Sequence, residues 1–150
     1  MSGRQQLQQL AQEIEVLNEQ QETLEEEVQS LQDDKADIDD AIATIEELES
    51  GSTIQVPLGG GSYVRAEVQD VDEVIVELGG DYAAERDQDA AIDSLETKQD
   101  TLDDRIEEVR EEISELETES QQLEQKAQQM QQQQMQQQMQ QMQGQEQDDE

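Results

Sequence analysis

The sequence contains no cysteine, histidine, tryptophan or phenylalanine, and it has one proline and two tyrosines. Without cysteine or histidine, the chain cannot form disulfides or use thiol or imidazole catalysis, and it lacks the side chains of the usual zinc sites. No apolar run approaches the ~18 residues that a membrane-spanning helix needs, and no apolar segment of a signal peptide is present. We therefore expect a cytoplasmic protein without a membrane partner.

Apolar residues are also scarce, at 31% of the 150 residues. Globular domains usually contain about 45–50%. The chain can therefore form one structural unit but not a large conventional core.

Positive charge is the next shortage, with 8 basic residues against 41 acidic ones and a net charge of −33. Such a chain would repel phosphate backbones, so we expect no nucleic-acid partner. The acidity has two interpretations, which are a surface for basic partners, such as a nucleic-acid mimic, and adaptation to a very salty cytoplasm. We favour the second, because the acids are spread over predicted helices, turns and strands alike rather than clustered in one patch, and about 1 M salt shortens the Debye length to about 3 Å.

Catalytic patterns are missing as well. Gly59–Gly61 do not continue into a dinucleotide or P-loop motif. The many carboxylates lie in no pocket-forming context that would shift a pKa. The sequence therefore predicts no enzyme, no metal site and no cofactor.

The residues that are present form a heptad repeat in the N-terminal third, with apolar residues three and four positions apart. These residues are Leu7, Leu10, Ile14, Leu17, Leu24, Val28, Leu31, Ile38, Ile42 and Ile45. They predict a long coiled-coil helix within residues 1–51, capped by Ser2 with Gln5 and ended at Gly51. Gln21 and Lys35 occupy a positions, where a polar residue either contacts a partner or sets the register of the coiled coil. We favour the second interpretation.

The same repeat returns after residue 86 and predicts a second helix over residues 87–134, with Asp87 as its N-cap. Its positions are Ile92, Leu95, Gln99, Leu102, Ile106, Val109, Ile113, Leu116, Ser120, Leu123, Ala127 and Met130. The two arms match in length and leave one compact middle segment, so we expect them to pair antiparallel. The predicted register pairs Ile45 with Ile92, Leu31 with Ile106, Leu17 with Ser120 and Leu7 with Met130.

The middle segment, residues 52–86, changes to short runs of alternating apolar and polar residues separated by glycines. This pattern predicts four strands in two β-hairpins, with an edge or a bulge at Pro57. The strand residues that share the apolar faces are Ile54, Val56, Leu58, Val64, Val68, Val74, Val76 and Leu78. Four short strands cannot close a core alone, so we expect other subunits to complete the sheet.

Residues 135–150 are rich in glutamine, methionine and acidic residues, and we expect a flexible tail there. Met135, Met139 and Met142 continue the three–four spacing in a shifted phase. Methionine suits surfaces that accept many apolar shapes. Two alternatives remain equal. The methionines of this tail contact apolar partners, or the tail has no role.

Two matched heptad arms around a strand–turn–strand pair resemble the organisation of the prefoldin α-class family. Val56–Val64, which reads VPLGGGSYV, resembles the first hairpin of that family, and Val74–Asp81, which reads VIVELGGD, resembles the second. The resemblance covers Leu7 to Met130, and the acidity suggests a halophilic archaeal member.

The resemblance implies an α+β fold, in which a long antiparallel coiled-coil hairpin carries two central β-hairpins that join an intersubunit β-barrel. It implies an ATP-independent molecular chaperone subunit in a heterohexamer of two α and four prefoldin β subunits. That complex would bind unfolded proteins at the coiled-coil tips and deliver them to a group II chaperonin. The apolar strand residues above would form the subunit interface. The client-binding residues at the tips would be Leu7, Leu10, Met130, Met135, Met139 and Met142. The alternative is an architectural coiled-coil protein that oligomerises or tethers without binding clients.

Overall fold

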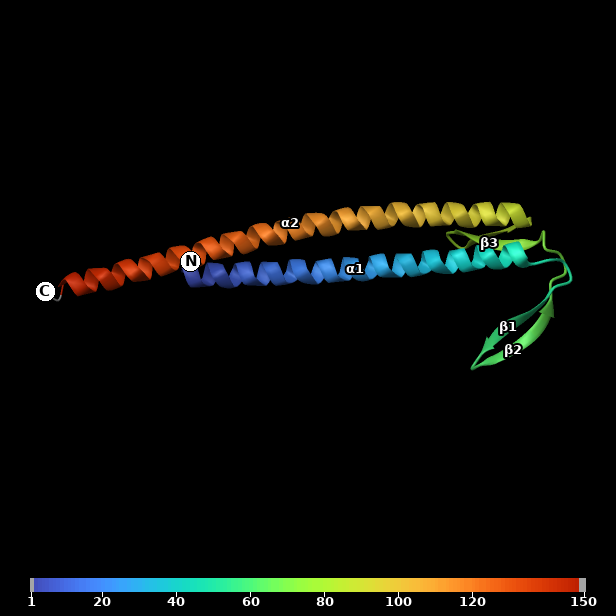
Figure 1. Cartoon of the computed structure of the whole chain (residues 1–150), viewed down its shortest axis with the longest axis horizontal. Helices are drawn as coiled ribbons and strands as arrows, with labels where there is room; N and C mark the ends of the chain where they lie inside the picture. The colour runs from blue at the N-terminus through green and yellow to red at the C-terminus, as the bar shows by residue number, and fades with distance from the viewer. Residues whose placement is uncertain (1, 149–150) are drawn as a thin grey trace. The chain divides into compact units, whose positions relative to one another are not determined.

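A computed structural model describes residues 2–148 as two long helices with four strands between them (Figure 1). The expected α+β fold class, with two long helices and two β-hairpins, is confirmed. The elements in order are α1 (Gly3–Glu47), β1 (Thr53–Gly59), β2 (Ser62–Glu67), β3 (Val74–Gly79), β4 (Tyr82–Arg86) and α2 (Gln88–Asp148). The described residues divide into two compact units, residues 2–29 with 107–148 and residues 30–106.

The predicted N-terminal caps of both helices are confirmed. The Gln5 N–H donates to Ser2 Oγ at 3.3 Å, and the Ala90 N–H donates to Asp87 Oδ1 at 2.8 Å. Each bond satisfies one of the backbone donors that the first turn of a helix leaves without a partner.

The helix ends differ from the predicted ones. α1 stops at Glu47, before Gly51, because the Gly51 N–H donates to the Val68 carbonyl oxygen at 2.7 Å and so belongs to the hairpin connection. α2 continues past residue 134 to Asp148. The expected flexibility of residues 135–150 stays a prediction, and residues 149–150 lie outside the described part of the chain.

The heptad positions of both helices form their buried faces. Every predicted apolar position from Leu7 to Ile45 and from Ile92 to Met130 is buried or half-buried. Val109 has no exposed surface, and Ile106 and Leu10 are 6% and 7% exposed. The period of the apolar residues, rather than their number, is what allows this acidic chain to form helices with an apolar seam.

In the first unit, polar contacts near the seam agree with the predicted register. Ser120 is buried, and its Oγ donates to Asn18 Oδ1 at 3.3 Å, one residue from the predicted partner Leu17. A Cβ on Gly3 would meet the side-chain amide of Gln134, so these two residues also lie together.

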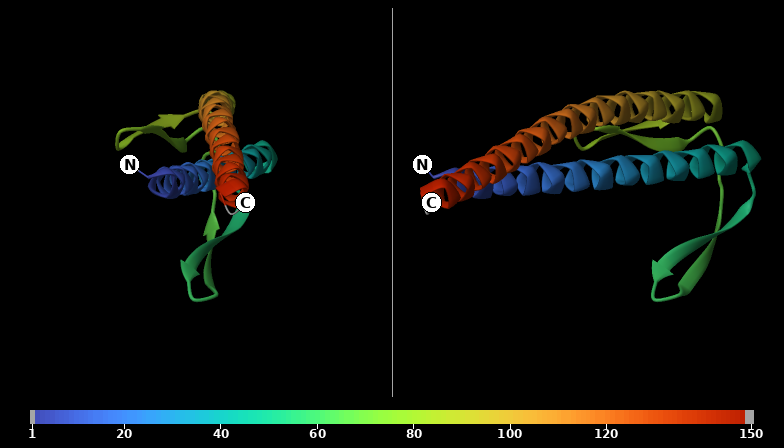
Figure 2. Two further views of the ribbon diagram at one scale, coloured as in Figure 1. Left: turned by 90° about the vertical axis from the view of Figure 1, so that its left-hand side faces the viewer. Right: turned by 60° about the vertical axis from the view of Figure 1, so that its left-hand side comes forward.

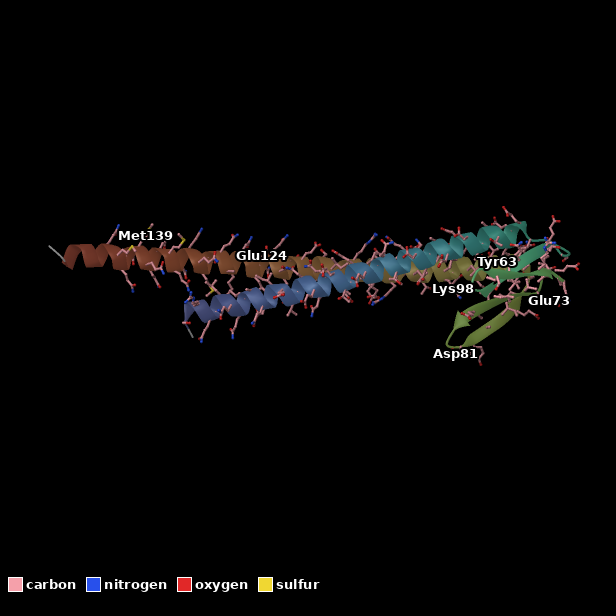
Figure 3. All side chains as sticks on the ribbon, turned by 90° about the horizontal axis from the view of Figure 1, so that it is seen from below. Tyr63, Glu73, Asp81, Lys98, Glu124 and Met139 are labelled. Atoms are coloured by element: carbon pink, nitrogen blue, oxygen red, sulfur yellow. The ribbon has the colours of Figure 1, made fainter. Side chains whose placement is uncertain are left out.

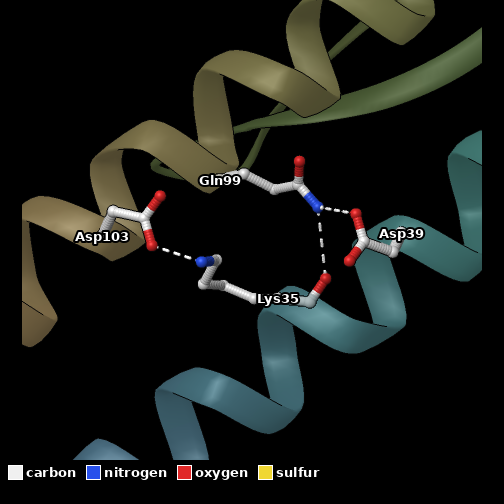
Figure 4. Close-up of polar contacts among 4 residues, drawn as sticks. All are labelled: Lys35, Asp39, Gln99 and Asp103. Atoms are coloured by element: carbon white, nitrogen blue, oxygen red, sulfur yellow. Dashed lines mark hydrogen bonds and ion pairs between the residues drawn. The ribbon is translucent and has the colours of Figure 1, made fainter.

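In the second unit, a polar layer joins the helices (Figure 4). Lys35 Nζ forms an ion pair with Asp103, and Gln99 Nε2 donates to the Lys35 carbonyl oxygen at 3.3 Å and to Asp39 Oδ1. Gln88 Nε2 donates to the Leu48 carbonyl oxygen at 3.2 Å. Polar groups in a seam need such partners to avoid an unpaired desolvated group. The interpretation of Lys35 as a polar core residue that sets the register agrees with these contacts.

Truncating Val109 tests the seam of the first unit. Val109→Ala should lower the free energy of unfolding by about 2 kcal/mol, because it removes two fully buried methyl groups. Val16 is 50% exposed, so Val16→Ala in the same unit is the matched control and should change stability by less than about 0.5 kcal/mol. Urea unfolding followed by circular dichroism measures both. Equal effects of the two substitutions would contradict the assigned seam.

The strands form two separate two-stranded antiparallel sheets, β1–β2 and β3–β4 (Figure 2). Gly60 and Gly61 have φ values of 59° and 77°, which side chains rarely tolerate and which the tight turn of the first hairpin requires. The register of β1 shifts between Pro57 and Gly59, next to the proline where an edge or a bulge was expected, and the register of β3 shifts in the same way between Glu77 and Gly79. No barrel closes within residues 2–148.

Candidate interaction surfaces

The first candidate surface lies on the two hairpins, and we call its eight predicted apolar residues the hairpin surface. In the first hairpin, Val56 lies directly opposite Val64, and Ile54 lies opposite Ala66. Ile54, Val56 and Val64 are 37%, 36% and 47% exposed. Leu58, in the bulge, is 67% exposed, so aliphatic side chains of this hairpin are accessible on both sides of Pro57.

The second hairpin presents less of its apolar face. Val76, opposite Ala84, is 4% exposed. Leu78 lines a recess with Ile38 of α1 and Leu102 of α2, so this hairpin lies along the helices of its own unit. Val76 is therefore covered within its own unit, whereas Leu78 on the same face of β3 remains 45% exposed.

Three further exposed residues were missed by the sequence analysis. Tyr63, Ile75 and Tyr82 are 61%, 71% and 77% exposed. The signal for Ile75 was present, because the run Val74–Ile75–Val76 is apolar at three consecutive positions and must place an apolar side chain on each face of the strand. The second face of β3 therefore carries one apolar side chain, Ile75, beside Glu77 and Gly79.

The second candidate surface lies where α2 extends beyond the N-terminal end of α1 (Figure 3). The six predicted client-binding residues divide here into two groups. Leu7 and Met130 are half-buried on the helix seam and Leu10 is buried. Met135, Met139 and Met142 are 62%, 64% and 71% exposed, and we call them the methionine stripe. The accessible part of this surface is therefore the methionine stripe.

A third feature is a shallow apolar groove in the first unit, which the sequence analysis did not identify. Val16, Leu24 and Leu116 are its apolar lining residues. Val16 lies outside the heptad positions and is half-exposed. The glutamates that line the groove are Glu19, Glu112, Glu115 and Glu119.

Electrostatic repulsion along this arm predicts a strong dependence of stability on salt. Glu111, Glu115 and Glu119 follow one another at intervals of four residues, and each such like-charge pair costs about 0.2–0.5 kcal/mol on a helix. Lowering the salt from about 2 M to about 0.1 M lengthens the Debye length several-fold. Summed over the helices, this should lower the midpoint of thermal unfolding, followed by circular dichroism, by on the order of 10 °C.

A variant of the arm provides the control for this prediction. Replacing Glu111, Glu115 and Glu119 with glutamine should raise the midpoint at low salt and leave it nearly unchanged at high salt. A midpoint independent of salt in the original chain would contradict the role of repulsion.

Neither a metal-binding cluster nor a membrane-spanning stretch is found in the described part of the chain. No group of three or more acidic side chains within residues 2–148 is arranged to hold a metal ion. Among those residues, neither helix has a stretch that is both long and apolar enough to cross a membrane.

Comparison with known proteins identifies relatives of this arrangement. The family model described as "Prefoldin subunit" matches residues 17–133. A protein named prefoldin subunit alpha from Haloarcula marismortui is 62% identical over 96 residues, which are 64% of this chain and 62% of that protein. The protein of the same name from Halorubrum lacusprofundi is 64% identical over 98 residues, 65% of this chain and 64% of that protein. The matches thus span a little under two thirds of these relatives.

A solved structure is similar in fold. A chain in the cryo-EM structure of filamentous PFD from Methanocaldococcus jannaschii has a TM-score of 0.66 and 26% sequence identity. The similarity covers 73% of this chain and 93% of that chain. Nearly the whole of that chain is therefore reproduced by the helix and hairpin arrangement described above.

Proposed function

The chain belongs to the prefoldin family, and on this premise we propose that it is the α subunit of an ATP-independent chaperone. In this proposal the hairpins assemble with other subunits, and the distal arm ends bind unfolded proteins and deliver them to a group II chaperonin. The observation that carries the proposal is the set of exposed aliphatic side chains on the β1–β2 hairpin, such as Leu58 and Val64. A two-stranded sheet with such an exposed apolar surface is only marginally stable in water unless further strands or another layer cover it.

Assembly with other subunits follows from the open sheets. Each hairpin pairs only its own two strands within residues 2–148, so each has strand edges that can accept further strands. We propose that prefoldin β subunits supply them in a complex of two α and four β subunits, in which the hairpins join an intersubunit β-barrel. Exposed apolar side chains on both hairpins, such as Leu58 on β1 and Ile75 on β3, support contacts of both hairpins with other subunits.

Client binding is assigned to the distal arm end because accessible apolar groups of α2 gather there. The methionine stripe offers three polarizable side chains, which adapt to many apolar shapes. Three side chains give a weak, reversible contact. Several arms around one client would raise the effective concentration and hold it by avidity. Release then needs no nucleotide, only a competing surface.

The first experiment measures mass by light scattering in molar salt, for the chain alone and mixed with a prefoldin β subunit from a halophilic archaeon. A discrete complex of two chains with four partners is expected. The same mixture should suppress aggregation of a chemically unfolded client protein. A stable monomer that ignores the partner would contradict the assembly. A complex that forms but protects no client would instead favour an architectural tether.

A further inference from the structure

Three methionines share one face near the C-terminal end of α2. Met135, Met139 and Met142 are four and three residues apart, so at about 100° per residue they lie within an arc of about 60°. All three are more than half exposed, at 62%, 64% and 71%. They therefore present three accessible thioether sulfurs side by side.

This face is not the continuation of the seam between the helices. Gln134 is half-buried and lies against Gly3, and Met135 is the next residue, about 100° further round the helix. Arg4 shares a recess with Gln134, Gln138 and Gln141. Glutamines thus continue the seam, and the methionine stripe faces elsewhere.

Met130 differs from the stripe in its surroundings. It occupies a heptad position of α2 and is half-buried. One helix therefore carries a partly protected methionine and three accessible ones, in a chain that has no cysteine. Oxidation of soft side chains follows their accessibility, and here no thiol can react first.

We propose that the methionine stripe is a reversible oxidation site that switches the distal arm end between an apolar and a polar state. Hydrogen peroxide transfers one oxygen atom to each thioether sulfur. The sulfur lone pair attacks the peroxide, the O–O bond breaks, a sulfoxide forms, and the peroxide is reduced to water. A methionine sulfoxide reductase reverses the change, because its dithiol is oxidised to a disulfide while the sulfoxide oxygen leaves as water.

The consequence of oxidation follows from the surrounding sequence. Residues 131–143 consist only of glutamine and methionine, so the methionines are the apolar component of this part of the surface. A sulfoxide is polar, and it disrupts contacts that methionine makes with apolar groups. The switch rests on the proposed function, because it would lower client binding while leaving assembly through the hairpins unchanged.

The test oxidises the full chain alone with hydrogen peroxide, removes the peroxide with catalase, and then adds the β subunit and an unfolded client. Peptide mapping by mass spectrometry should find sulfoxides at Met135, Met139 and Met142 forming at least about three times faster than at Met130. Suppression of client aggregation should fall several-fold, and treatment with methionine sulfoxide reductases should restore it. The mass of the complex should not change.

The matched control replaces Met135, Met139 and Met142 with leucine, which keeps the face apolar and cannot be oxidised. This variant should protect the client equally before and after peroxide. Oxidation of Met130 as fast as the other three, or full client protection by the oxidised chain, would overturn the switch. If neither untreated protein protects clients, the proposed function fails, and the order of sulfoxide formation then decides on the oxidation site separately.

Discussion

Replacing Val56 and Val64 with aspartate should abolish assembly of the chain with its partner subunits. The two valines lie directly opposite each other on β1 and β2 and are 36% and 47% exposed. An interface that covers this face would have to bury two carboxylates beside each other, and each unpaired buried charge costs several kcal/mol. Affinity should therefore fall by at least about 100-fold, which corresponds to about 2.8 kcal/mol.

The measurement is light scattering of mixtures in molar salt, with circular dichroism to show that the helices remain. The control lies on the other face of the same hairpin, where Gln55 is opposite Arg65. Gln55→Asp adds an acidic residue to the same strand, and it should leave assembly intact because it places the charge beside a guanidinium and away from the apolar face. A full-size complex formed by the valine variant at the original concentrations would refute the assigned interface.

Deleting residues 128–150 should remove most of the client protection while leaving the complex assembled. The deletion removes Met130 and the methionine stripe, which are the main apolar groups of this part of α2. The hairpins belong to the other compact unit, residues 30–106, so the assembly surface should remain. Suppression of aggregation should fall several-fold at equal concentrations of complex, because avidity multiplies the loss at each arm.

The matched control for this deletion removes only residues 144–150, which keeps the methionine stripe and takes away Gly144 and the acidic end. This shorter deletion should protect clients as well as the full chain does. Unchanged protection after the longer deletion would show that this arm end does not bind clients. Equal losses in both variants would assign the effect to the acidic end instead.

The helices, their seams and their pairing were predictable from local patterns. A repeat of three and four residues selects one face of a helix, so the half-buried positions from Leu7 to Ile45 follow from spacing alone. The antiparallel register could be inferred because two heptad repeats of matched length leave one short segment, and the contact of Ser120 with Asn18 agrees with it. Turn positions such as Gly60 and Gly61 were evident because few other residues adopt positive φ.

The degree of burial on each strand was decided only by the tertiary structure. Val56 and Val76 look alike in the sequence, since each lies in a strand three residues before the glycine of a turn, yet Val56 is 36% exposed and Val76 is 4% exposed. Alternation determines which face of a strand is apolar but not what covers that face. Whether a strand face is covered depends on how the hairpin packs against α1 and α2. Residues distant in the sequence determine that packing.

The same distinction applies to the distal arm. Leu10 and Met139 both fit a three–four spacing, but Leu10 is 7% exposed and Met139 is 64% exposed. The sequence by itself determined that this chain forms two long helices with apolar seams and two hairpins, because those features depend on period and turn chemistry. Only the tertiary structure decided which apolar side chains remain accessible to a partner, because accessibility depends on where α1 begins beside α2.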